Sequence, residues 1–125
     1  MAILSVTPQL RTTNIENSID FYVSKLGFEL AFRYEDFYAG INVGGQQIHF
    51  KLVDEADPSL AFVHQGEHFH LYFTTDDVEK KAQALGQLGI PFHSAITETA
   101  WGTKEFAVAD DQGHILYFGQ PLQGR

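Results

Sequence analysis

The chain has 125 residues, of which 44% are hydrophobic and 19% charged, enough for one globular domain with a hydrophobic core. Sixteen acidic and eight basic residues give a formal net charge of −8. With no basic cluster, the chain is a poor partner for nucleic acid or anionic membranes, whereas a cationic small molecule would be attracted. The absence of cysteine excludes disulfides and thiolate metal sites, and no apolar run is long enough for a membrane span. Because the N-terminus lacks a secretion signature, we expect a cytoplasmic protein.

The first part of the chain is predicted to form a strand, a helix and three further strands. Residues 3–13 read as the first strand, which Pro8 bends or confines to a sheet edge. Asn14 is expected to cap a helix with apolar side chains at helical spacing, and Gly27 to end it. The three strands that follow are expected over 28–33, 37–43 and 46–53.

A polar, proline-containing stretch separates this first part from a second copy of the same pattern. We expect a first module over 1–58, a linker over 59–67 and a second module over 68–120. In the second module a strand over 69–75 leads to Asp76, the expected helix cap, and Gly89 closes that helix.

Three landmarks recur at one offset and support this internal repeat. Asn14 and Asp76 are 62 positions apart, and so are the two Leu-Gly pairs at 26–27 and 88–89 and the two Thr-Thr pairs at 12–13 and 74–75. The fold class is therefore α+β, with paired βαβββ modules. Each module leaves one sheet face uncovered by its helix, so the two are expected to form a curved mixed sheet around a cup.

The last part of the second module, residues 101–118, reads as two strands joined by an Asp-Gln-Gly turn. Period-two alternation divides its side chains between two faces. One face holds Phe106, Val108, Leu116 and Phe118, and the other holds Glu105, Ile115 and Tyr117. A face that mixes aromatic and acidic residues is compatible with the wall of a binding cup and equally with an ordinary half-buried hairpin.

Several motifs resemble the vicinal oxygen chelate superfamily, which contains glyoxalases, dioxygenases and bleomycin resistance proteins. The motifs are NIENSIDFY at 14–22 followed by LGF at 26–28, EDFYAG at 35–40, and WGTKEF at 101–106 leading into DDQG at 110–113. The Trp-Gly segment, together with acidic and aromatic residues near the first hairpin, is most similar to the bleomycin resistance branch. This resemblance implies paired βαβββ modules in a homodimer, and Pro8 fits the family's tendency to exchange the first strand between subunits.

The same resemblance locates the positions at which superfamily enzymes hold a metal ion. These positions fall at or near Thr7, His49, His70 and Tyr117. Threonine is a poor ligand and tyrosine a rare one for the divalent metals concerned, so the set is incomplete. His49, His70 and Glu105 could still form a site with two histidines and one carboxylate, with Gln9 as a substitute if the register differs.

Two functional hypotheses with a ligand follow, and one without. The first is a non-catalytic protein of the bleomycin-resistance type that needs no cofactor and sequesters an amphipathic aromatic, possibly cationic, ligand in a dimer cleft. The second is a metal-dependent lyase, isomerase or dioxygenase that uses His49 and His70 with Zn, Ni, Fe or Mn. The third is a structural or regulatory dimer without a small ligand.

The side chains expected to line the cup combine aromatic rings with polar and charged groups, a mixture that suits planar rings with charged substituents. The expected lining is Thr7, Gln9, Arg11, His49, Lys51, His70, Tyr72, Glu105 and Tyr117, with Phe37, Tyr38 and Trp101 near the rim. The cations Arg11 and Lys51 leave room for an acidic or zwitterionic ligand.

Overall fold

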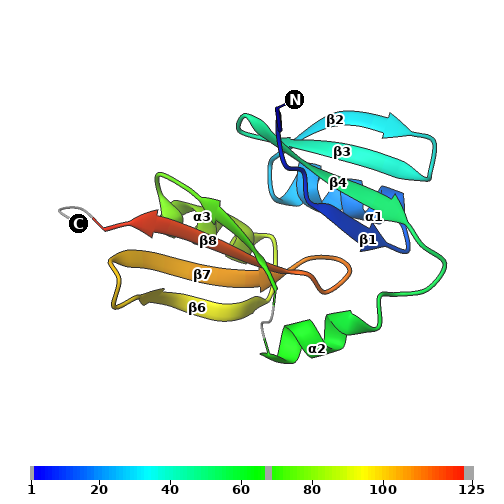
Figure 1. Ribbon diagram of the computed structural model, residues 1–125. Helices are drawn as coiled ribbons and strands as arrows, with labels where there is room; N and C mark the ends of the chain where they lie inside the picture. Colours follow the sequence, from blue (N-terminus) through cyan, green and yellow to red (C-terminus); the bar gives the residue numbers. More distant parts are fainter. Residues whose placement is uncertain (1, 67–68, 123–125) are drawn as a thin grey trace. The chain divides into compact units, whose positions relative to one another are not determined.

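The computed structural model describes residues 2–66 and 69–122. The chain divides into two compact units, Met1–Asp57 (unit 1) and Pro58–Arg125 (unit 2), each built on a four-stranded sheet (Figure 1). The predicted α+β class with paired βαβββ modules is confirmed. None of the described helices is both long and apolar enough to cross a membrane.

Unit 1 contains one helical segment and one mixed sheet. Its elements are β1 (Gln9–Thr12), α1 (Ile15–Ile19), the π-helix η1 (Asp20–Lys25), β2 (Glu29–Tyr34), β3 (Tyr38–Val43) and β4 (Gln46–Leu52). The strand order is β1-β4-β3-β2, in which β1 runs parallel to β4 and the other neighbours are antiparallel.

Local polar contacts fix the beginning of α1, as the sequence predicts. The Asn14 side chain accepts a hydrogen bond from the backbone N–H of Asn17 at 3.0 Å, which satisfies one free donor of the first turn. A buried hydrogen bond of 2.8 Å joins the hydroxyls of Thr12 and Ser18, so the end of β1 is tied to the helix. The fully buried ring of Tyr22 then packs 4.7 Å from that of Phe50 in β4.

Unit 2 repeats this arrangement after an additional helix. Its elements are α2 (Ser59–Gly66), β5 (Leu71–Thr74), α3 (Val78–Gln87), β6 (Phe92–Glu98), β7 (Thr103–Ala109) and β8 (Ile115–Pro121). The strand order is β5-β8-β7-β6, again with one parallel pair, β5 and β8.

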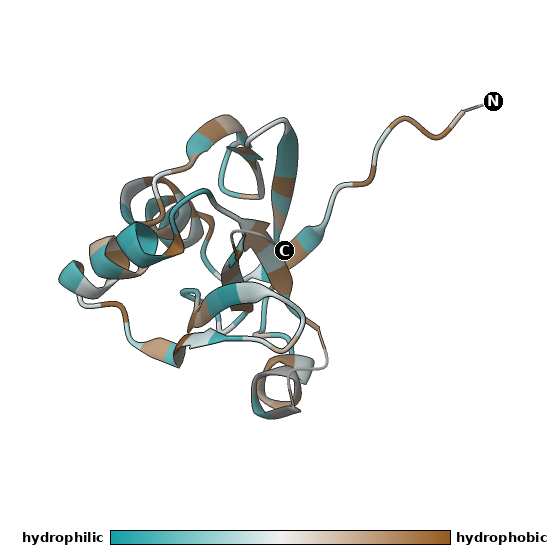
Figure 2. Cartoon of the chain, turned by 90° about the vertical axis from the view of Figure 1, so that its left-hand side faces the viewer, coloured by the Kyte–Doolittle hydropathy of each residue, from teal (hydrophilic) through white to brown (hydrophobic). Residues whose placement is uncertain are grey.

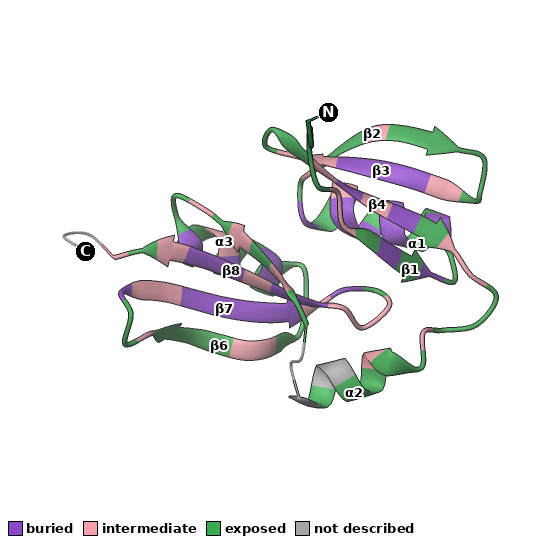
Figure 3. Ribbon diagram, in the orientation of Figure 1, coloured by how far each residue is buried: buried purple, intermediate pink, exposed green. Residues whose placement is uncertain are grey.

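A row of phenylalanine rings fills the core of unit 2 beneath α3. Phe73, Phe118, Phe106 and Phe92 stack in sequence across the sheet, with ring centroids 5.1, 5.2 and 5.1 Å apart. These residues come from four different strands, so their stacking links every strand of the sheet. In this sheet burial is greatest in the inner strands β7 and β8 (Figure 3). Phe106 and Phe118 lie together on this face, as the alternation predicts.

The repeat is confirmed at its helix ends but shifts at its caps. Gly27 and Gly89 both adopt positive φ, 82° and 79°, and each follows its helix. The cap of α3 is Asp77, so the prediction of Asp76 is wrong. Gly27 follows its cap Asn14 by 13 positions, and Gly89 follows Asp77 by only 12. The additional residue in unit 1 is accommodated by η1, whose wider turns take one residue more than an α-helix.

The structure also differs in the length of the first strand and adds a helix to the predicted linker. The first strand is only β1, and residues 2–8 have no regular structure, with Ile3, Leu4 and Val6 each more than 80% exposed. Figure 2 shows this apolar, extended segment leading to the N-terminus. The stretch expected as a linker contains α2, which includes the Leu-Ala-Phe-Val run. This helix has only eight residues, too few to show a clear helical period in the sequence.

Candidate functional site

In each unit the helix covers one sheet face and leaves the other without a helical cover. In unit 1, α1 contacts β3 and β4, and in unit 2, α3 contacts β6, β7 and β8. We call the uncovered sides open face 1 and open face 2. Open face 1 is defined by Gln9, Arg11, Phe32, Tyr38, Gly40, Asn42, Gln47, His49 and Lys51, and open face 2 by His70, Tyr72, Thr103, Glu105, Ala107, Tyr117 and Gly119.

A chain of hydrogen bonds crosses open face 1 and has one consistent direction. Gln9 Nε2 donates to the Tyr38 hydroxyl at 2.8 Å, and this hydroxyl contacts His49 Nδ1 at 2.7 Å. His49 Nε2 lies 2.8 Å from Gln47 Oε1, and Gln47 Nε2 donates to Asn42 Oδ1 at 3.2 Å. Since Gln47 presents an oxygen to the ring, Nε2 carries the proton and Nδ1 accepts from Tyr38. Both ring nitrogens of His49 are therefore engaged.

Phe32 completes an aromatic cluster with two members of this chain. Its ring stacks on that of Tyr38, with centroids 6.0 Å apart and planes at 16°, and meets the ring of His49 edge-on at 5.1 Å. Gly40 makes this possible, because a Cβ at that position would lie 2.3 Å from the Phe32 ring. Phe32 is 40% exposed, so the cluster presents part of its aromatic surface to solvent.

The other predicted residues of unit 1 are not members of this cluster, although Lys51 is the cross-strand neighbour of Tyr38. Arg11 and Lys51 are neighbours across β1 and β4, and the Arg11 guanidinium lies 4.0 Å from Asp57. Phe37 lies in the turn between β2 and β3, half exposed, with its ring 6.5 Å from that of Tyr34. Thr7 precedes β1 and belongs to no strand.

On open face 2 a buried carboxylate accepts hydrogen bonds from two hydroxyls. Glu105 Oε2 accepts from the Tyr72 hydroxyl at 2.8 Å and from Thr103 Oγ1 at 2.9 Å, and the residue is only 9% exposed. The Thr103 hydroxyl in turn lies 2.8 Å from Thr99 Oγ1. Burial, followed by the hydrogen bond and the charge of Glu105, raises the pKa of Tyr72 above its ordinary value.

A glycine lets the tyrosine reach that carboxylate. Tyr72 belongs to β5 and Glu105 to β7, so the phenol must cross β8, which lies between these two strands. It does so over Gly119, where a Cβ would lie 1.7 Å from the hydroxyl. Beside it, the ring of His70 lies 4.4 Å from that of Tyr117. Trp101, in the turn before β7, is 75% exposed.

The donor set fits a catalytic divalent metal poorly. Neither unit, over the residues described, gathers three histidine, aspartate or glutamate side chains in a group that could hold an ion. His49 would have to give up its hydrogen bond to Tyr38 or Gln47 before it could ligate. At the fourth family position, the Tyr117 ring packs against His70.

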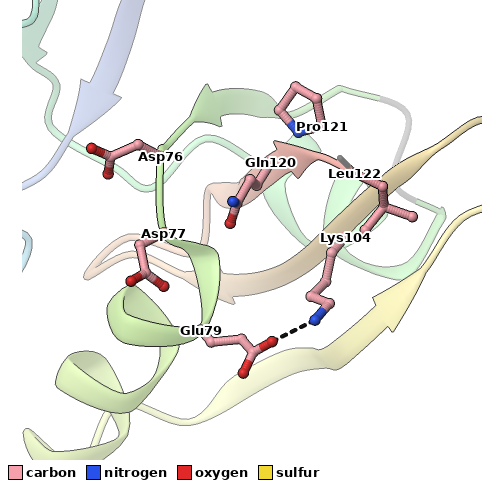
Figure 4. Close-up of a pocket in the computed structure, with 7 residues that line it drawn as sticks. All are labelled: Asp76, Asp77, Glu79, Lys104, Gln120, Pro121 and Leu122. Atoms are coloured by element: carbon pink, nitrogen blue, oxygen red, sulfur yellow. Dashed lines mark hydrogen bonds and ion pairs between the residues drawn. The ribbon is translucent and has the colours of Figure 1, made fainter. Parts of the chain in front are cut away.

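A separate cavity of about 370 Å³ lies at the N-terminal end of α3, and none of its lining residues is a predicted site residue (Figure 4). Lys104, the one basic side chain among its described lining residues, forms an ion pair with Glu79. The Gln120 side chain accepts from the Val78 N–H at 2.8 Å. The lining residues are Asp76, Asp77, Glu79, Lys104, Gln120, Pro121 and Leu122. Its cation and its first helical donor thus already have protein partners.

Sequence reasoning missed Phe32, Gln47 and Thr103, although two of them carried a signal. Gln47 precedes His49 by two positions in β4, and Thr103 precedes Glu105 by two in β7, so alternation places each pair on one face. For Phe32 there was no such signal, because its position depends on the contact with Gly40 and on a register shift between Leu30 and Phe32.

Comparisons with known proteins agree with this architecture. The family model described as the glyoxalase/bleomycin resistance protein/dioxygenase superfamily matches residues 3–118. Curated proteins give no significant match to the sequence.

Three similar solved structures illustrate the range of this family. A glyoxalase/bleomycin resistance protein/dioxygenase from Alicyclobacillus acidocaldarius is 24% identical with a TM-score of 0.76, over 93% of this chain and 89% of that one. The bleomycin-binding protein from Streptomyces verticillus, complexed with copper(II)-bleomycin, is 20% identical with a TM-score of 0.70, over 94% and 96%. Lactoylglutathione lyase from Agrobacterium tumefaciens is 15% identical with a TM-score of 0.74, over 96% and 95%. At such identities the likeness establishes the fold alone.

Proposed function

Since the chain belongs to the glyoxalase/bleomycin resistance protein/dioxygenase superfamily, we propose that it binds a small organic molecule with a planar aromatic part and releases it unchanged. The observation that carries this proposal is the full engagement of His49. A general base or a metal ligand needs a free lone pair, and the hydrogen bonds to Tyr38 and Gln47 occupy both ring nitrogens. A binding surface has the opposite requirement, because fixed side chains lose little entropy when a ligand arrives.

Open face 1 supplies the chemistry for a planar ligand. Phe32 and Tyr38 offer ring surfaces for stacking, and aromatic pairs contribute about 0.5–1.5 kcal/mol beyond the area they bury. The hydrogen bonds from Gln9 and to His49 hold the Tyr38 ring in position. The cluster is therefore rigid, aromatic and edged by polar groups, the combination found in sites for amphipathic ring compounds.

We also propose that the binding form is a homodimer with an exchanged N-terminal segment. Ile3, Leu4 and Val6 expose nearly their whole side chains, and an apolar segment of this kind gains most when a second copy covers it. The test is the molar mass in solution, measured by light scattering after gel filtration. A monomer at micromolar concentration would refute the homodimer. A dimer that persists when these three residues are replaced by serine would refute the exchange.

The direct test of binding is calorimetric titration with metal-free bleomycin, which combines flat heteroaromatic and cationic parts. Trp101, the sole tryptophan, provides a second readout by fluorescence. Replacing Phe32 by Ala should weaken binding, by about tenfold if one stacking contact is lost. The matched control is Phe62→Ala, which removes an exposed phenylalanine from α2. No heat and no fluorescence change up to millimolar ligand would rule out the antibiotic.

The enzyme alternative has its own test. Protein purified without chelator should contain less than stoichiometric Zn, Ni, Fe or Mn, and addition of these ions should not produce lyase, isomerase or dioxygenase activity. An equimolar ion whose loss abolishes an activity would replace the binding proposal with a catalytic one.

A further inference from the structure

We propose that open face 2 contains a cation subsite within unit 2, in which the Glu105 carboxylate binds the ammonium or amidinium group of a small organic molecule. This inference rests on the proposed function, because it specifies the charge of the molecule that is bound. The subsite consists of Glu105 and the two hydroxyls that hold it, from Tyr72 and Thr103. Glu105 is the residue that would select for charge, and the two hydroxyl groups position it.

The first argument is that Glu105 is buried and that no described basic side chain of unit 2 pairs with it. It is 9% exposed, and among the residues described in unit 2 no lysine, arginine or histidine forms an ion pair with it. Its cross-strand neighbours Thr97 and Gly119 are uncharged, and the adjacent Lys104 is paired with Glu79. A buried carboxylate is costly to keep without a countercharge, so an incoming cation would gain more here than at an exposed carboxylate.

The second argument is the direction of the hydrogen bonds. Tyr72 and Thr103 both donate to Glu105 Oε2, and among the described residues no side chain donates to Glu105 Oε1. Because the Thr103 hydroxyl donates its proton to Glu105, it can act only as an acceptor toward Thr99, whose hydroxyl also donates to the Thr103 carbonyl at 3.3 Å. The two hydroxyl protons that contact Glu105 therefore both point toward the carboxylate. The two hydrogen bonds hold the carboxylate in position, and Oε1 is left for a ligand N–H.

The surroundings of Glu105 are suited to an organic cation. Across β8 the phenol of Tyr72 lies over Gly119, and Tyr117 is the neighbour of both Tyr72 and Ala107 in the register. The carboxylate is thus bordered by aromatic and small apolar side chains. Aromatic faces attract cations as well as rings, so the apolar body of the ligand and its charged end would both find favourable partners.

A purely structural role for Glu105 makes a different prediction. If the residue only ties β5 to β7, Glu105→Gln would keep an acceptor for both hydroxyls and leave ligand affinity unchanged. If it is a cation subsite, the same substitution removes the charge and selectively weakens cationic ligands. The matched control is Glu79→Gln, which makes the same change of net charge in the same unit at a carboxylate already paired with Lys104.

The experiment is a titration of the full chain, labelled with nitrogen-15, with three probes of one shape: benzamidinium, neutral benzamide and anionic benzoate. We expect benzamidinium to shift the amide signals of β7 and β8 and to bind at least about tenfold more tightly than benzamide, the gain expected of a charge-assisted hydrogen bond. Glu105→Gln should abolish this preference, and Glu79→Gln should retain it. The dispersion of the amide signals shows whether each variant is folded, and Tyr72→Phe, which keeps the charge, should weaken the preference only in part.

Three results would overturn the inference. Equal affinity of the wild-type protein for benzamidinium and benzamide would leave small-molecule binding intact but remove the selection for charge. An equal loss in both glutamine variants would show that only the overall charge matters. Binding of none of the probes would also refute the subsite, and the titration with bleomycin and Phe32→Ala on open face 1 would then decide the proposed function separately.

Discussion

Gly119→Ala tests whether the crossing of Tyr72 over β8 holds open face 2 together. A Cβ at this position would lie 1.7 Å from the Tyr72 hydroxyl and 2.4 Å from Cζ, closer than non-bonded atoms approach. The phenol must therefore move by more than an ångström. That displacement breaks its 2.8 Å hydrogen bond to Glu105, whereas the backbone need not move, because Gly119 does not adopt positive φ.

The size of the effect follows from two opposing terms. A hydrogen bond to a charged group contributes about 1.5–3 kcal/mol, and the lower end applies here because Tyr72 is 45% exposed and water can replace part of the contact. Alanine in a strand gains about 0.5–1 kcal/mol over glycine from reduced backbone entropy. We therefore expect Gly119→Ala to lower the free energy of unfolding by about 1 kcal/mol.

A double-mutant cycle isolates the contact. In a Tyr72→Ala background the clash is absent, so the same Gly119→Ala change should be neutral or stabilising by up to about 1 kcal/mol. The assay is urea unfolding at neutral pH, followed by circular dichroism, with the four variants compared at equal concentration. An equal effect of Gly119→Ala in both backgrounds would refute the account, because the substitution would then not act through Tyr72.

Three further predictions concern the helix ends and the buried carboxylate. In α3, a Cβ added at Gly86 would meet no atom within 4 Å, so Gly86→Ala should raise the free energy of unfolding by up to about 1 kcal/mol. Gly89 has a φ of 79°, so Gly89→Ala should lower the free energy of unfolding by about 1 kcal/mol in the same urea assay. Equal effects of the two substitutions would contradict the helix-end geometry. Asn14→Ala should lower it by about 0.5–2 kcal/mol, since the first turn of α1 loses its cap, and Asn14→Asp should restore most of that loss. The pKa of Tyr72 is raised, so the stability it contributes is fully present below the ordinary tyrosine pKa of 10.0 and is lost as the pH rises through the higher folded pKa. Absorbance at 295 nm should therefore show one phenol that titrates late. Glu105→Gln should lower the pKa of this phenol. A titration unchanged by that substitution would show that the carboxylate does not act on the phenol.

The elements that sequence predicted best are those that local chemistry determines. The cap at Asn14 and the glycines after both helices depend on contacts within a few positions, and each is where the pattern indicates. The faces of the last hairpin follow from period two, and Phe106 does pack against Phe118. Alternation also placed His49 and Glu105 on the faces opposite the helices, whereas Tyr38 was expected only near the rim.

The errors arise where a longer-range partner decides the structure. Residues 2–8 have the composition of a strand, but pairing begins only where the carbonyl of Pro8 accepts from the His49 N–H. The helix α2 is short and was missed because a few apolar residues in a polar stretch do not define a period. The shift from Asp76 to Asp77 at the α3 cap reflects an additional residue in the preceding loop. The sequence did not indicate this residue, because Gly27 and Gly89 still recur at the offset of 62.

The contacts of the candidate site were beyond sequence reasoning for a common physical reason. In each open face an aromatic ring lies across a strand at a glycine: Phe32 over Gly40 in unit 1 and Tyr72 over Gly119 in unit 2. In unit 1 the glycine brings a ring to the Tyr38–His49 pair, and in unit 2 it brings a hydroxyl to Glu105. Alternation predicts which side a residue is on but not that a missing side chain lets a neighbour lie flat across the strand. Gly40 and Gly119 thus determine how Phe32 and Tyr72 lie across the neighbouring strands.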